Sequence, residues 1–300
     1  MNGKIPFLSI ATTALCATAL LQGCSELVLF NPKGPIGESE RQVIIIAFAL
    51  MLIVVIPVII MSVWFPLKYR ASNTKAAYEP NWCKSNKIEA AMWLIPVAII
   101  VALSVVAWRE THRLDPYRPI PSQARTLEVE VISLDWKWLF IYPEQQVAVV
   151  NQFVFPAKAP VHFRLTSDTV MTSFFIPQLG SQIYAMAGMQ TQLNLLADAP
   201  GEFTGQNQQF SGAGFPQMSF PAVADTPENF EAWVAKVKRS PDRLDRARLT
   251  ELCKPGVSES VQYFSSIEPG LFESIIAKYA AMPMHAAPAG DTMQHPAHGQ

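Results

Sequence analysis

The sequence predicts a membrane-anchored α+β protein, in which a transmembrane hairpin of two helices precedes an all-β sandwich or barrel and a helical extension. Three observations support this fold class. Two long apolar runs stand before residue 109, alternating patterns begin near residue 126, and a helical period returns after residue 226. The 300 residues are 50% hydrophobic and 16% charged, which is too apolar for most soluble proteins of this size. A net charge of −1 without long blocks of like charge excludes a nucleic-acid partner.

Residues 1–23 have the pattern of an export signal. Lys4 precedes an apolar run over residues 5–21, and a small residue, Gly23, stands before Cys24. Residues 21–24 resemble the bacterial lipoprotein signal, in which the cysteine is acylated and becomes the new N-terminus. We therefore expect a lipoprotein signal peptide over 1–23, a covalent lipid on Cys24 and a periplasmic segment over 24–42. An ordinary signal peptide or a first membrane helix is the alternative interpretation.

Two runs are long enough to cross about 30 Å of hydrocarbon. Residues 43–65 carry no charge, and residues 88–108 carry one, Glu89, at their start. Pro57 and Pro96 lie inside these runs, which is tolerated in a bilayer where neighbouring helices satisfy the freed backbone groups. The runs predict transmembrane helices that pack against other membrane subunits.

The connecting segment 66–87 sets the orientation. It holds five basic residues and one acidic residue, Glu79, as expected of a cytoplasmic loop. An exported Cys24 requires the same orientation and places everything after residue 108 in the periplasm of a bacterial inner membrane. Cys83 then faces the reducing cytoplasm and Cys253 stands alone outside, so no disulfide framework is expected.

The exported part begins with β patterns. Hydrophobic residues alternate with polar ones around Val129 and again around Phe163, as in strands with one buried face. We predict a β-sandwich or barrel within residues 109–222, ending near Pro221.

Residues 223–280 predict a helical extension. Thr226 and Pro227 offer a capped helix start, and a second helix is expected from Glu268 or Pro269 through Tyr279. Residues 281–300 consist mostly of Ala, Pro, Met and His with little to bury, which predicts a disordered tail.

Two spans, an export signal and an exported sandwich together resemble subunit II of the haem-copper respiratory oxidases. The resemblance runs from Cys24 to about Tyr279 and is strongest over residues 169–191, TVMTSFFIPQLGSQIYAMAGMQT. It implies that the sandwich is cupredoxin-like. In the cytochrome c oxidases of this family the sandwich holds two copper ions through which electrons enter.

The copper ligands of those relatives are missing here. Their ligand loop spaces Cys, Cys, His and Met at i, i+4, i+8 and i+11, with another His upstream. The glycine-rich segment 205–218 aligns with that loop, and the five positions are occupied by Thr172, Asn207, Ser211, Phe215 and Met218. Soft thiolates and imidazoles are what such a copper centre requires, and only Met218 offers a soft donor. We therefore expect no metal bound by this chain, and a loop held by glycine turns and amide hydrogen bonds instead.

Other positions agree with this interpretation. Between His112 and Tyr279 the chain has one Cys, Cys253, and two His, of which His162 falls on the polar face of a strand. Gln209 replaces the Glu that contributes to a magnesium site in copper-containing relatives, which puts that site in doubt. Residues 135–138 resemble the aromatic segment that receives electrons from cytochrome c, but without copper they are better explained as packing.

The absence of an electron inlet indicates the cytochrome bo-type ubiquinol oxidases of the family. The segment after Ala222 is similar to the aromatic-rich extension of that branch. The resemblance implies a respiratory, proton-pumping complex that oxidises ubiquinol and reduces oxygen to water. The haems and copper would lie in the large subunit I of this complex, and ubiquinol would also bind through that subunit. This chain would be a structural cap on subunit I and would carry no catalytic centre. The sequence leaves open whether the quinol is ubiquinol or menaquinol, although residues 174–190 resemble the ubiquinol branch more closely.

Glu89 is a candidate proton-channel entrance. The predicted topology places it at the cytoplasmic end of the second span, and the corresponding Glu in relatives stands near the mouth of a proton channel. An ionisable group at this boundary is a functional candidate. A carboxylate favoured by the helix dipole is the alternative.

Two alternative functions follow from other features. The tail contains Met282, Met284, His285, Met293, His295 and His298, which suits a membrane-anchored copper-delivery protein. The chain could also be a cytochrome c oxidase subunit II with a degenerate copper site.

Overall fold

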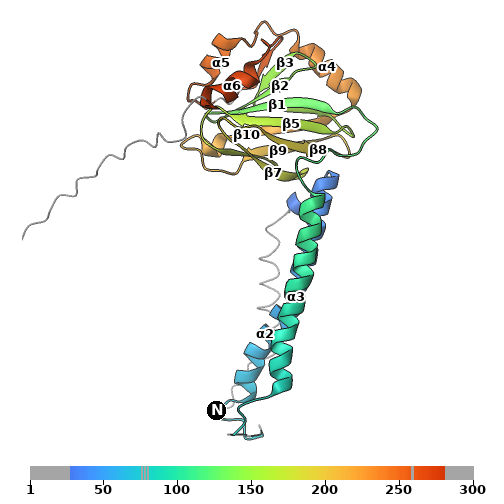
Figure 1. Ribbon diagram of the computed structural model, residues 1–300, viewed down its shortest axis with the longest axis vertical. Coiled ribbons are helices and arrows are strands. Elements are labelled where there is room, and N and C mark those ends of the chain that lie inside the picture. Colours follow the sequence, from blue (N-terminus) through green and yellow to red (C-terminus); the bar gives the residue numbers. More distant parts are fainter. Residues whose placement is uncertain (1–27, 76, 78, 80, 258–259, 281–300) are drawn as a thin grey trace, which may run out of the picture.

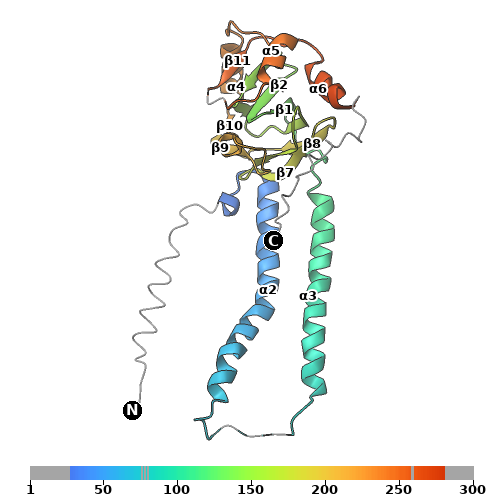
Figure 2. The same ribbon diagram turned by 90° about the vertical axis from the view of Figure 1, so that its left-hand side faces the viewer.

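The computed structural model describes residues 28–75, 77, 79, 81–257 and 260–280. The predicted signal peptide, Cys24 and the tail after residue 280 lie outside these residues. Two long helices stand side by side beneath a β-sandwich, and three short helices cover the sandwich on the side away from them (Figure 1; Figure 2).

The two long helices are α2 (Pro35–Lys68) and α3 (Asn86–Arg113). Both are long and apolar enough to cross a membrane by length and composition. Each is longer than its predicted span, because helical structure continues through polar turns at the ends. At the sandwich end α2 gains about two turns before Val43, where Pro35 at the first helical position favours an early start.

The sandwich consists of two sheets. One has the order β11-β3-β2-β1-β5-β8 and the other β4-β10-β9-β6-β7. The strands are β1 (Leu127–Leu134), β2 (Lys137–Tyr142), β3 (Val147–Val150), β4 (Phe153–Pro156), β5 (Val161–Ser167), β6 (Thr172–Ile176), β7 (Gly180–Ala185), β8 (Thr191–Leu195), β9 (Gly201–Asn207), β10 (Ser219–Asp225) and β11 (Gln262–Phe264).

The predicted alternation produces the core between the sheets. In β1, Val129 and Val131 are fully buried, while Glu128 and Glu130 point to the other face. Strand β5 lies parallel to β1 and places Phe163 beside Val129. These side chains join the fully buried Trp138 of β2 and aromatic residues of the second sheet, among them Phe174 of β6, in one hydrophobic cluster.

The sandwich extends beyond the predicted end near Pro221. Strand β10 continues to Asp225, so the boundary expected at residue 222 falls inside a strand. Pro221 is opposite Thr204 of β9, whereas pairing with β4 starts at Ala222. The missing N–H of the proline therefore interrupts no pairing with β4.

The extension contains a strand as well as helices. Helix α4 (Pro227–Val237) begins as predicted, because Thr226 Oγ1 accepts a hydrogen bond from the Asn229 amide at 3.3 Å. Helix α6 (Leu271–Ala280) starts two to three residues later than predicted. Helix α5 (Arg246–Leu252) and strand β11 were not expected from the sequence. Strand β11 adds to the first sheet beside β3, and this segment buries the outer face of that sheet in a second hydrophobic cluster.

Candidate functional site

The predicted ligand loop connects β9 to β10 at one end of the sandwich. It comprises residues 208–218 and ends in a short 3-10 helix, η3 (Phe215–Gln217). Gly212 has φ of 102°, a conformation that favours glycine. At Gly214 a Cβ atom would lie 2.3 Å from Cδ2 of Trp136, so a larger residue would displace the indole. These two glycines allow the loop to turn closely around Trp136.

Asn207 holds the loop together from its base. It is 5% exposed, and its Oδ1 accepts hydrogen bonds from the amides of Ser173 and Gln209, both at 2.9 Å. Its Nδ2 donates to the Gln209 carbonyl at 2.8 Å, to Ser211 Oγ at 3.2 Å and to Met218 Sδ at 3.4 Å. One buried amide thus satisfies both donors and acceptors across the loop, which is the arrangement expected from the sequence.

The upstream position is also satisfied within the protein. Thr172 is 1% exposed, and its Oγ1 donates to Ser133 Oγ at 2.7 Å. Its neighbour Ser173 accepts from the Gln208 amide at 2.7 Å through Oγ. Ser133 and Ser173 were not identified from the sequence, because single serines on buried strands carry no distinctive pattern.

The five aligned positions do not all converge. Asn207, Ser211 and Met218 are joined by hydrogen bonds, and Ser211 Oγ donates to Met218 Sδ at 3.9 Å. Phe215 instead packs against Phe210, with ring centroids 5.8 Å apart. Gln209 takes part through its backbone N–H and carbonyl.

The aromatic segment 135–138 packs as expected. Trp136 Nε1 donates to the Ser211 carbonyl at 2.8 Å and thereby braces the loop. Trp138 is fully buried and contacts Phe174 and Phe220 edge-on, at centroid distances of 5.4 and 5.8 Å.

These residues do not fit a dinuclear copper centre. The amide and hydroxyl groups of Asn207, Ser211 and Thr172 are hard neutral donors already engaged in hydrogen bonds, and the one soft atom, Met218 Sδ, accepts two of them. Within the described part of the chain no three His, Cys, Asp or Glu side chains lie close enough to hold a metal ion.

The remaining candidate donors are occupied elsewhere. Burial and the neighbouring Asp168 raise the pKa of the Cys253 thiol to about 12, so it stays protonated at neutral pH. His162 Nδ1 lies 2.6 Å from Glu128 Oε2, on the outer face of the first sheet.

Comparison with known proteins agrees with this geometry. Residues 126–226 match the family model described as cytochrome c oxidase subunit II, periplasmic domain, and residues 238–282 match the COX aromatic rich motif. Subunit 2 of the cytochrome bo(3) ubiquinol oxidase of Pseudomonas aeruginosa is 52% identical over 279 residues, which are 93% of this chain and 84% of the relative. Ubiquinol oxidase subunit 2 of Acetobacter aceti is 51% identical over 267 residues, 88% and 86% of the two chains.

The chain belongs to the ubiquinol oxidase subunit 2 family. Among solved structures, the periplasmic domain of subunit II of the cytochrome oxidase of Bradyrhizobium japonicum is 19% identical and covers 40% of this chain and 96% of its own, with a TM-score of 0.37.

Glu89, the other predicted site residue of this family member, lies in the first turn of α3, at the end of the helix remote from the sandwich. Its carboxylate is 55% exposed and lies 3.9 Å from Lys84 Nζ. The structure thus places an accessible acid where the second span begins.

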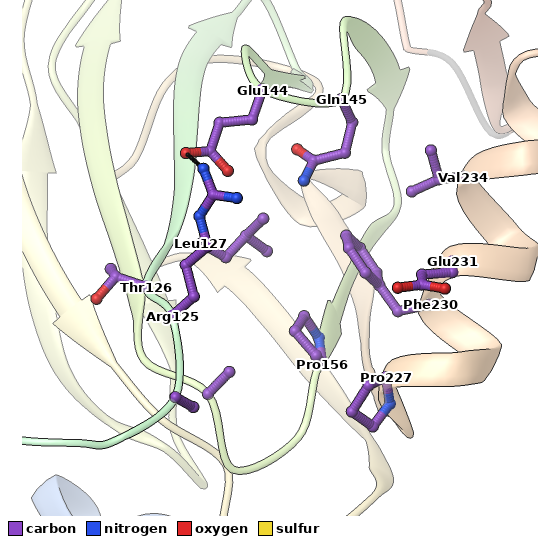
Figure 3. Close-up of a pocket in the computed structure, with 12 residues that line it drawn as sticks. Arg125, Thr126, Leu127, Glu144, Gln145, Pro156, Pro227, Phe230, Glu231 and Val234 are labelled. Atoms are coloured by element: carbon purple, nitrogen blue, oxygen red, sulfur yellow. Dashed lines mark hydrogen bonds and ion pairs between the residues drawn. The ribbon is translucent and has the colours of Figure 1, made fainter.

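A cleft between the sandwich and α4 is shown in Figure 3. It has a volume of about 380 Å³ and an apolar floor that includes Leu127, Phe230 and Val234. At its rim Arg125 Nη2 lies 2.9 Å from Glu144 Oε1, but the arginine side chain is 83% exposed, so this pair contributes little. Phe230 also packs against Trp233 and Tyr142. We therefore interpret the cleft as part of the packing contact between α4 and the sandwich.

Proposed function

We propose that this chain is the non-redox subunit II of a respiratory, proton-pumping ubiquinol oxidase, a complex that oxidises ubiquinol and reduces oxygen to water. The observation that carries the proposal is the Asn207 network, which occupies the positions of the copper donors in a chain whose relatives are named ubiquinol oxidase subunit 2. Since those donors are absent, electrons would enter the complex at membrane level in the large subunit. Haems and copper would reside there, and this chain would bind neither.

The work of the chain would then be structural. Helices α2 and α3 expose apolar side chains along most of their lengths, as suits helices that pack against lipid and other membrane subunits. The sandwich stands directly above them, where it can cap the large subunit. A rigid joint between α2 and the sandwich supports this role, because Glu40 Oε1 accepts from the Ser181 amide at 2.8 Å and the Gly37 amide donates to the Leu179 carbonyl at 3.0 Å.

Topology and anchoring complete the proposal. The sandwich would lie in the periplasm of the bacterial inner membrane, and the basic segment between the spans in the cytoplasm. A lipid on Cys24 would add an anchor to the two spans. Glu89 would then face the cytoplasm, where it could supply protons to a channel of the large subunit.

The test is purification of the oxidase in mild detergent through a tag on this chain. A haem spectrum should show co-purified haems, and the preparation should consume oxygen with ubiquinol-1 as the electron donor but not with reduced cytochrome c. Oxidation of cytochrome c, or stoichiometric copper in the isolated chain, would refute the proposal.

A further inference from the structure

A cleft lies between the sandwich ends of α2 and α3, the two helices that stand below the sandwich in Figure 2. Its volume is about 210 Å³. Its lining changes from apolar to polar at the same level on both helices. Val43 and Ile46 of α2 face Val105 and Val106 of α3 on the membrane side, and Ser39, Gln42, Arg109 and Glu110 line the other end. Trp108, 71% exposed beside this polar end, marks the membrane interface.

The polar end contains one acceptor without a donor. Glu110 Oε2 is buried and accepts no hydrogen bond from any described residue, and the closest cation, Arg113 Nη1, is 3.9 Å away. Ser39 Oγ donates to the Pro35 carbonyl and Gln42 Nε2 donates to Glu38 Oε1, and neither group bonds to Glu110 Oε2. A buried carboxyl oxygen left without a donor is costly, so the cleft favours a ligand that brings one.

The same end contains a cation without a partner. Arg109 lines the cleft and makes no ion pair or side-chain hydrogen bond with any described residue. A second cleft, which shares Ser39, is lined by Arg113, Arg118 and one acidic residue, Asp115, and adds further basic groups toward the sandwich. A ligand that fits therefore carries a hydrogen-bond donor for Glu110, an anion for Arg109 and an apolar tail for the valine-lined end.

We propose that this cleft binds one phospholipid with a primary amine in its headgroup, as in phosphatidylethanolamine. The ammonium donates to Glu110, the phosphate accepts from Arg109, and an acyl chain lies along Val43, Ile46, Val105 and Val106. A quinol ring would satisfy Glu110 but has no anion for the arginine, so the charges favour the lipid. The site depends on the two helices lying in a membrane and not on the proposed oxidase activity.

The test compares lipids that differ in the donor alone. The full chain, with the subunits that purify with it, is reconstituted into vesicles of equal parts dioleoyl phosphatidylethanolamine and dioleoyl phosphatidylcholine, then extracted and examined by native mass spectrometry. The trimethylammonium group of phosphatidylcholine has no N–H. We expect one retained phosphatidylethanolamine, preferred by about tenfold, since a hydrogen bond to a charged group is at stake.

Variants assign the contacts. Glu110→Gln should abolish the preference between the two lipids, Arg109→Gln should lower retention of both, and Val106→Phe should displace the lipid by filling the apolar end. Glu79→Gln and Arg70→Gln, in the segment that connects the other ends of the two helices, are matched controls and should retain it. A preference that survives Glu110→Gln, equal retention of both lipids by the unchanged chain, or a bound quinone lost in Glu110→Gln in place of lipid would overturn the site. The haem spectrum and quinol-oxidase assay report the proposed function separately.

Discussion

At the scale of single residues, Asn207 shows how a loop can be stabilised without a metal. Its amide receives two backbone N–H groups and donates to three acceptors. Asn207→Ala would leave several buried groups unpaired, and we expect the free energy of unfolding of the sandwich to fall by about 3 kcal/mol. Thermal unfolding of the full chain in detergent, followed by near-UV circular dichroism, measures the loss. Gln208→Ala, at an exposed neighbour, should change little, and equal melting of both variants would contradict the role of Asn207.

Glu130 predicts a pH dependence of stability. Burial raises the pKa of this carboxyl to about 6, and Arg164 Nη1, 2.8 Å away, only partly opposes the shift. Between pH 4.5 and 6 the folded state therefore keeps a proton that the unfolded state has lost, so this group makes stability fall as the pH rises through that window. Glu130→Gln should remove a fall of about 2 kcal/mol, measured as the difference between wild-type and variant unfolding at pH 4.5 and 7. A constant difference would contradict the shift.

The sequence identified the residues of the loop, but it did not identify the residues on other strands that form hydrogen bonds with this region. Asn207, Ser211 and Met218, three of the aligned positions, come together because the loop closes between two paired strands. Phe215 does not join them, since it points to Phe210. The partners Ser133 and Ser173 come from β1 and β6, and such long-range pairings leave no local signal in the sequence.

At the scale of elements, the joint between α2 and β7 is built from close backbone contacts. A Cβ at Gly34 would lie 2.1 Å from the Leu196 carbonyl oxygen, which cannot move without disturbing the sandwich. Gly34→Ala should therefore separate the start of α2 from the sheet and weaken the hydrogen bonds from Lys33 to Gln178 and from Gly37 to Leu179. We expect hydrogen exchange at these two amides to accelerate by about tenfold or more. Gly256→Ala is the control, because open space surrounds that position; unchanged protection in Gly34→Ala would argue against a rigid joint.

The helices and strands that could be predicted from the sequence are those with a strong local pattern. The spans, the alternating strands β1 and β5 and the capped start of α4 were all visible in the sequence. Strand β11 was not, because its three residues are too few to show a period and their place beside β3 depends on a contact more than 100 residues distant in the chain. Helix α5 has a signal that could have been found, since Asp245 caps it by accepting from the Arg248 amide at 2.7 Å.

At the scale of the whole molecule, the helices and the sandwich act as one support. The extension wraps the first sheet and is tied back to it where Lys278 Nζ donates to the buried Asp168 at 2.8 Å. The second sheet rests on α2 through β7. One side of the sandwich is thus closed by the chain itself and the other is fixed on the membrane helices, which leaves the spans to position the molecule in a larger complex.

This arrangement also affects Glu89. Because α3 is fixed in position at its sandwich end, the Glu89 side chain at the other end of the same helix is fixed in position too. The side chain is 55% exposed and its pair with Lys84 is loose, so Glu89→Gln should leave assembly unchanged. If Glu89 delivers protons to the large subunit, the same change should lower ubiquinol-dependent oxygen consumption several-fold. Glu79→Gln, in the connecting segment 66–87 that precedes α3, is the control for a lost surface charge. Normal oxygen consumption by the Glu89→Gln oxidase, with haem content equal to wild type, would reduce Glu89 to a carboxylate that favours the start of a helix.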